Sequence, residues 1–222
     1  MLIKITFPII ILLFSTGIAS AQRFESVEKE AERILVALSD GDSLNATDLT
    51  EMKKLLSPDK DENESGLTPT ISQQSIDSLT NHLTQFESEL KNISTDSAFV
   101  LFNEWYLHFQ NIFYEYSKEK FFASPKTKIL LFSTSMSCYC TLKMCRNQTV
   151  DILKYVSENT DKYEYWIIDS YWHNELQIEY ETLFAPSVIV FDGNNKVLYK
   201  IEYEEKMIAN LENYLQKNKG SN

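Results

Sequence analysis

The sequence predicts an α/β protein in which an all-helical N-terminal region precedes a mixed β-sheet with flanking helices. Up to about residue 122 the apolar residues recur at intervals of three and four, as they do on one face of an α-helix. Beyond residue 125, short runs of β-branched and aromatic residues alternate with helical segments in the order β-α-β-α-β-β-α. That order predicts a mixed sheet with helices on both faces.

Residues 1–21 have the pattern of a secretory signal peptide. Lys4 precedes a short apolar core over residues 7–14, and the small-x-small sequence at residues 19–21 is a cleavage site that leaves Gln22 first in the mature chain. The apolar core is shorter than the about 20 residues of a retained membrane span. We therefore expect a secreted or periplasmic protein without stable membrane insertion after signal cleavage, and an uncleaved anchor is the alternative.

Residues 22–124 form the predicted helical region. Helices are expected over residues 24–38, 47–56, 76–93 and, as one long helix, from Asp96 to Phe122. Residues 57–70 contain two prolines, a glycine and many charges, so they predict a mobile connection. The long helix carries an aromatic stripe: Phe99, Phe102, Tyr106, Phe109, Phe113 and Tyr116. Aromatic side chains at helical spacing bury large apolar areas, so we interpret this stripe as core rather than as a ligand groove.

Residues 125–222 form the predicted sheet domain. Strands are expected over residues 128–132, 163–169, 187–191 and 196–203, and helices over residues 141–159, 175–183 and around 208–215. Asp192-Gly-Asn-Asn195 is the expected hairpin turn between the last two strands.

The formal net charge of −11 makes some partners improbable on physical grounds. An acidic surface repels nucleic acid and anionic lipid, so neither is an expected partner. The acidic residues are scattered along the chain rather than clustered, which is typical of a solubilising surface.

The three cysteines, Cys138, Cys140 and Cys145, fall within eight residues. A disulfide scaffold spreads its cysteines to join distant loops, and an odd number cannot all pair within one chain. In an exported protein such a cluster suggests chemistry or metal binding more than structure.

Cys140 is the predicted attacking thiolate. It precedes the helix expected from Thr141, and a helix N-terminus stabilises a thiolate through its dipole and its unpaired N–H groups. Lys143 and Arg146 are expected to add positive potential. Cys145 lies on the apolar stripe of the same helix, so we expect it to be buried, either as simple core or as a resolving thiol.

Cys138 is the favoured resolving partner because it is near Cys140 in sequence and exposed. A ring closed across one intervening residue is strained, which predicts a strongly oxidising disulfide.

A buried strand, a cysteine at a helix start and the segment Ala185-Pro186-Ser-Val-Ile-Val-Phe191 together resemble the thioredoxin-like superfamily over roughly the last hundred residues. The resemblance implies a cis-proline at Pro186 beside the reactive cysteine, and a substrate strand bound by the backbone of Ala185. The cysteine site departs from the family pattern, because Ser137-Cys-Tyr-Cys140 replaces Trp-Cys-x-x-Cys and Leu131 replaces a buried acid.

Three functions remain open at this point. The resemblance implies an exported thiol–disulfide oxidoreductase without cofactor or metal, which acts on protein or small-molecule disulfides and exchanges electrons with a redox partner protein. The soft ligands Met136, Cys138, Cys140, Met144 and Cys145 suit Cu(I), as in Sco-type copper chaperones of the same fold, with His173 as the distant ligand. The third alternative is a non-enzymatic binding protein that has kept the fold.

Overall fold

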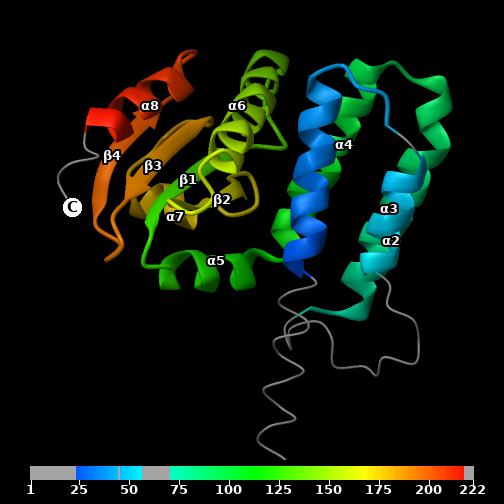
Figure 1. Ribbon diagram of the computed structural model, residues 1–222, viewed down its shortest axis with the longest axis horizontal. Helices are drawn as coiled ribbons and strands as arrows, with labels where there is room; N and C mark the ends of the chain where they lie inside the picture. Colours follow the sequence, from blue (N-terminus) through cyan, green and yellow to red (C-terminus); the bar gives the residue numbers. More distant parts are fainter. Residues whose placement is uncertain (1–23, 45, 57–70, 218–222) are drawn as a thin grey trace, which may run out of the picture. The chain divides into compact units, whose positions relative to one another are not determined.

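The structure is a computed structural model that describes residues 24–44, 46–56 and 71–217 (Figure 1). The predicted signal peptide at residues 1–21 and the predicted connection at residues 57–70 lie outside the described residues. The chain divides into two compact units, Met1–Phe99 and Val100–Asn222. This division falls within a helix, whereas the domain boundary predicted at residues 124 and 125 separates helices from strands.

The first unit is helical, as predicted. A helix covers residues 24–39, followed by α2 (Ala46–Leu56), α3 (Gln73–Glu89), the short 3₁₀ helix η1 (Leu90–Asn92) and the start of α4 (Thr95–Ile112). The side chains at the predicted helical spacing are buried: Phe24, Val27, Ala31, Ile34, Leu35, Leu38, Leu49, Met52, Leu56, Ile76, Leu79, Leu83 and Phe86. Apolar burial on one face of each helix therefore accounts for these elements.

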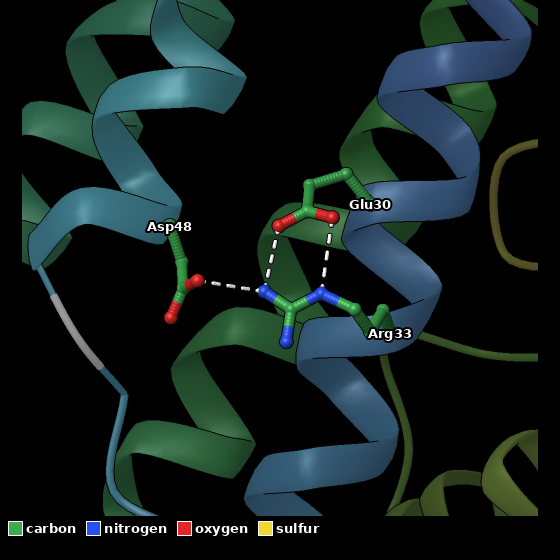
Figure 2. Close-up of polar contacts among 3 residues, drawn as sticks. All are labelled: Glu30, Arg33 and Asp48. Carbon is green, nitrogen blue, oxygen red and sulfur yellow. Dashed lines mark hydrogen bonds and ion pairs between the residues drawn. The ribbon is translucent and has the colours of Figure 1, made fainter.

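Ion pairs join these helices at their polar edges. Arg33 lies between Glu30 of its own helix and Asp48 of α2, with N–O distances of 2.7 and 2.8 Å (Figure 2). Lys53 of α2 similarly pairs with Glu87 of α3 at 2.7 Å. These pairs are partly exposed, so each adds at most about 1 kcal/mol and the apolar core dominates.

The prediction of one long helix from Asp96 to Phe122 is wrong, because α4 ends at Ile112 and α5 (Tyr114–Ala123) follows it. Phe113 leaves helical geometry at φ −96° and ψ 13°, although its N–H still donates to the Phe109 carbonyl at 3.1 Å. The break lets α5 turn toward the sheet, where its Tyr114 and Phe121 join the core. The interpretation of the aromatic stripe as core is confirmed for its buried members, which are Phe102, Tyr106, Phe109 and Phe113, whereas Phe99 and Tyr116 are only partly buried.

The second unit contains the predicted mixed sheet. Its strands are β1 (Thr127–Ser133), β2 (Tyr163–Asp169), β3 (Ser187–Phe191) and β4 (Val197–Glu202), in the spatial order β2-β1-β3-β4. The strand β1 runs parallel to β2, and β3 is antiparallel to both β1 and β4. The helices are α6 (Tyr139–Ser157), α7 (Glu175–Glu179) and α8 (Met207–Lys217). The predicted α/β fold, a thioredoxin-like mixed sheet with flanking helices after a helical region, is confirmed.

The two faces of the sheet pack against different helices (Figure 1). Since side chains alternate along a strand, one set faces α5 and α7 and forms a common core: Leu130, Phe132, Trp166, Ile168, Ile189 and Phe191, with Tyr114, Phe121 and Leu176. On the other side, α6 packs against β1 and β2, and α8 packs against β4.

The pairing of the strands places the end of β1, the end of β2 and the start of β3 side by side at one end of the sheet. Ser133, the last residue of β1, pairs with Asp169, the last residue of β2. Ser187, the first residue of β3, pairs with Phe132 of β1. The loop that leads to Cys138 and the segment around Pro186 therefore start from neighbouring positions. Among the described residues, no helix combines the length and apolar character that a membrane crossing needs.

Candidate active site

The loop that follows β1 is anchored by the buried carboxylate of Asp169. Asp169 Oδ1 accepts hydrogen bonds from the backbone N–H groups of Ser135 and Tyr171, at 3.0 and 3.1 Å, and Oδ2 accepts from Asn111 Nδ2 at 3.3 Å. Ser170 adds a bond from its hydroxyl to the Ser133 carbonyl at 2.8 Å. These bonds tie the ends of the two parallel strands together, so the loop leaves the sheet in a defined direction.

The helix α6 begins at Tyr139, so the prediction that it begins at Thr141 is wrong. Cys138 is the N-cap residue: its carbonyl accepts the first intrahelical bond, from Leu142 N–H at 3.0 Å, and its backbone is extended. Cys140 therefore lies inside the first turn of the helix. Cys138, rather than Cys140, is therefore the cysteine whose thiolate the N-terminus of the helix stabilises.

The sulfur atoms of Cys138 and Cys140 are neighbours on the surface. Both residues are exposed, and their Sγ atoms are 2.7 Å apart, longer than the about 2.05 Å of a disulfide bond. A third group, Thr141 Oγ1, lies 3.3 Å from Cys138 Sγ.

These groups lower the pKa of the Cys138 thiol to about 6. The largest cause is the hydrogen bond from Cys140, followed by the Thr141 hydroxyl and the backbone N–H groups at the helix start, although no N–H makes a close capping bond to the sulfur. With a pKa of about 6, the Cys138 side chain is mostly a thiolate at neutral pH.

Cys145 differs from the other two cysteines in both burial and ionisation. Its side chain is 1% exposed, as the apolar stripe predicted. Burial raises the pKa of the Cys145 thiol to about 11, an increase that Thr134, Ser133 and the charge of Arg146 only partly offset. The thiol is therefore protonated and shielded at neutral pH, and Arg146 acts on this buried cysteine.

A cleft of about 510 Å³ lies beside the cysteine loop. Its lining comes from three parts of the chain at this end of the sheet. These are the loop after β1 with the first turn of α6 (Thr134, Met136, Ser137 and Thr141), the segment after β2 (Ser170 and Gln177), and the residues before β3 and after β4 (Leu183, Phe184, Ala185 and Tyr203). This volume is within the range of ligand pockets. Ala185, expected to bind substrate, lies in the cleft, and the bond between Ala185 and the buried Pro186 is cis.

The segment before Pro186 is held by side chains and backbone at the end of β4. Glu202 Oε1 accepts from the backbone N–H of Phe184 at 3.0 Å and also from that of Leu183. Tyr203 N–H donates to the Pro186 carbonyl at 2.9 Å. The backbone is thus fixed while the side chains of Leu183 and Phe184 remain 78% and 58% exposed at the rim of the cleft.

His173, the distant ligand expected for copper, lies in a different setting. Its ring stacks on Tyr114 with centroids 3.7 Å apart, and its Nδ1 lies 3.7 Å from Glu175. Burial lowers the pKa of the His173 imidazole. Within the described parts of the chain, no three residues among His, Cys, Asp and Glu cluster in a way that could hold a metal ion, so His173 does not join the cysteines in such a group.

The site residues that the sequence did not predict include Thr141, Asp169 and Tyr203. Asp169 could have been found, because polar residues at the carboxyl ends of parallel strands commonly line sites. Thr141 and Tyr203 had no local signal, since their contact joins residues that are far apart in the chain.

The solved structures that resemble this chain include two thioredoxins. The germline-specific thioredoxin Deadhead of Drosophila melanogaster is 18% identical, with a TM-score of 0.38, and the match covers 46% of this chain and 92% of that one. Mitochondrial thioredoxin 3 of Saccharomyces cerevisiae, in its oxidized form, is 12% identical with a TM-score of 0.37, over 47% and 88% of the two chains. A designed protein is 16% identical with a TM-score of 0.35, over 46% and 84%.

No protein-family model matches the chain, and no curated protein matches it significantly. The assignment of a thioredoxin-like fold rests on the strand order, directions and register of the sheet. Identities this low say nothing about activity.

We expect Asp169→Ala to destabilise the protein by roughly 3 kcal/mol, because it leaves three partly buried N–H donors without their acceptor: Ser135, Tyr171 and Asn111. Asp169→Asn is the matched control. It keeps the Oδ1 acceptor, and the Asn111 amide can turn to accept from the new amide, so the loss should be about 1 kcal/mol. Urea unfolding of the three proteins measures both values. Equal destabilisation by the two substitutions would contradict the assigned hydrogen bonds.

The three thiols should differ sharply in their reaction with iodoacetamide. Cys138 should label about tenfold faster at pH 7 than at pH 5, because its pKa of about 6 lies between these values. Cys145 should be at least about a hundredfold slower than Cys138 at pH 7, since it is buried and protonated. Mass spectrometry of peptides locates the label, and labelling in guanidinium is the control. Equal rates for all three in the folded protein would overturn this ordering.

Proposed function

We propose that this chain is a thiol–disulfide oxidoreductase that acts on protein or small-molecule disulfides. One observation carries the proposal: Cys138 and Cys140 are exposed with their sulfur atoms 2.7 Å apart, and Cys138 stands at the start of α6 with a lowered pKa. A nucleophilic thiolate and a second thiol within reach are the two groups that disulfide exchange requires.

In the proposed reaction Cys138 attacks and Cys140 resolves. The Cys138 thiolate attacks one sulfur of the substrate disulfide, and the other substrate sulfur leaves as a thiolate that takes a proton. Cys140, once deprotonated, attacks the Cys138 sulfur of the mixed disulfide and releases the second substrate thiol. The substrate gains two electrons, and the protein ends with a Cys138–Cys140 disulfide that a redox partner protein must reduce.

These roles reverse those expected from the sequence. Cys140 was expected to attack because the helix was expected to begin at Thr141, and the helix begins at Tyr139 instead. Cys145 takes no part, because its buried, protonated thiol is neither accessible nor nucleophilic.

The cleft supports a substrate with an apolar, extended segment. Exposed apolar side chains line it, which is unusual for a surface that has no partner: Met136, Leu183 and Phe184. Ala185 would offer its backbone to such a segment, as the resemblance to thioredoxin-like proteins implies. Among the described residues, Gln177 Nε2 is buried without a hydrogen-bond partner and lines this cleft, so it can donate to a substrate carbonyl.

Single serine substitutions test these roles. Cys138→Ser should abolish the reduction of insulin disulfides with dithiothreitol as electron donor. Cys140→Ser should trap a mixed disulfide with glutathione on Cys138, since nothing remains to resolve it. Cys145→Ser should keep activity within about twofold and serves as the control for substitution within the same helix. The assays are insulin precipitation and intact-mass spectrometry of the adducts.

Two outcomes would contradict the proposal. Full activity of Cys138→Ser would show that another cysteine attacks. An unmutated protein with three inert thiols and no exchange would remove the oxidoreductase and leave the non-enzymatic binding protein.

Cu(I) binding is the second candidate, and one observation favours it. Met136 is 61% exposed on the loop that leads to the two adjacent sulfur atoms, and thiolates with a thioether suit Cu(I). Copper analysis of the same preparations separates the candidates, because bound copper that blocks thiol alkylation supports this site and metal-free reactive thiols support exchange.

We also propose that the protein is exported, on the basis of the leader pattern at residues 1–21. When the whole chain is expressed in a bacterial host, the exported form should begin at Gln22. Intact-mass measurement of protein recovered from the periplasm checks this. A periplasmic chain that retains residues 1–21, or no export at all, would contradict it.

A further inference from the structure

A chain of hydroxyl groups connects Cys138 to the end of β4. Thr141 Oγ1 lies 3.3 Å from Cys138 Sγ, and the Tyr203 hydroxyl lies 3.2 Å from the same Thr141 oxygen. Thr141 is buried, whereas Tyr203 is 43% exposed and lines the cleft. The two hydroxyls come from positions 62 residues apart, so only the folded chain brings them together.

The direction of the hydrogen bonds follows from the proton count. A thiolate can only accept, so Thr141 must donate its single hydroxyl proton to Cys138. The Thr141 oxygen is then an acceptor, and Tyr203 donates to it. Hydrogen bonds in such a chain polarise one another, so the phenol strengthens the bond that Thr141 gives to the sulfur.

The backbone of Tyr203 is a second, independent observation. Its φ is 51°, in the left-handed region that a bulky side chain rarely adopts and that costs free energy. At this position the Tyr203 N–H reaches the Pro186 carbonyl at 2.9 Å, and the ring packs on Phe184 with centroids 6.0 Å apart. The N–H of this strained residue is turned toward the wall of the cleft and its hydroxyl toward the cysteine helix, so its conformation serves the site rather than the strand.

We propose that Tyr203 is a positioning residue that stabilises the Cys138 thiolate through Thr141. The inference rests on the proposed role of Cys138 and adds a residue to that site. Tyr203 does not touch the reacting sulfur, and it acts only by orienting and polarising the Thr141 hydroxyl. Its contact with the segment before Pro186 also makes the ionisation of Cys138 depend on the wall of the cleft.

Other groups around Cys138 bear on the same ionisation. On α6 these are Cys140, which is in direct contact, Lys143, which is exposed one turn on, and Cys145, which is buried. From β4, the carboxylate of Glu202 is turned to the backbone of residues 183 and 184. All of these stay in place when the Tyr203 hydroxyl alone is removed.

The test is the pH profile of iodoacetamide labelling at Cys138 in Tyr203→Phe. The midpoint of the profile should rise by about half a unit, and the plateau rate above the midpoint should stay that of the unmutated protein. Thr141→Val should raise the midpoint by about one unit, and Thr141→Ser, which keeps the hydroxyl, should restore it. Tyr199→Phe is the matched control, because Tyr199 lies on β4 and stacks on Tyr214 at 4.2 Å instead.

The double variant shows whether Tyr203 acts through Thr141. In a Thr141→Val background, Tyr203→Phe should cause no further shift of the midpoint. An unchanged midpoint in Tyr203→Phe would overturn the proposal. A labelling rate at Cys138 that falls by the same factor at every pH, or a variant that fails to fold, would also overturn it, because either result gives the Tyr203 hydroxyl a merely structural role.

Labelling needs no disulfide exchange, so the two proposals can fail separately. If the shift is found in a protein that exchanges no disulfides, the hydroxyl chain stands and the oxidoreductase falls. If the protein exchanges disulfides but the midpoint in Tyr203→Phe does not shift, the oxidoreductase stands and the role of the hydroxyl chain falls.

Discussion

The buried carboxylate of Asp169 is the constraint on which the site depends. It stands at the end of β2, beside the end of β1, and accepts from the backbone of the loop that leads to Cys138. Partly buried N–H groups are costly to leave unpaired, so this side chain helps to fix the direction in which the loop leaves the sheet. The loop leads directly to Cys138, the N-cap residue of α6.

The N-cap and the inner face of α6 hold cysteines with opposite chemistry. Cys138 caps the helix and gains hydrogen bonds that favour its charged form. Cys145 lies two turns further on the inner face, where burial disfavours the thiolate more than the neighbouring polar groups stabilise it. The difference comes from position alone, because the residue type is the same. The exposed pair is suited to exchange, and the buried thiol is part of the core that holds α6 on the sheet.

The last strand, β4, contributes more to the site than its place at the edge of the sheet suggests. Glu202 fixes the backbone before Pro186, and Tyr203 joins that segment to the cysteine helix. The two walls of the cleft are thereby coupled through one residue in a strained conformation. Strain of this kind persists only where surrounding contacts over-determine it, as the bonds to Pro186 and Thr141 do here.

The sequence by itself determined the elements, their order and the core. Apolar spacing predicted the helices, short β-branched runs predicted the strands, and the apolar stripe of α6 predicted the burial of Cys145. These signals are local, because burial of one face depends on residues a few positions apart. Tertiary structure decided the break at Phe113, where α5 turns to the sheet, and the start of α6 at Tyr139, where the anchored loop ends. It also decided the contact of Tyr203 with Thr141, because residues distant in the chain meet only through the pairing and packing of the strands, which no local pattern encodes.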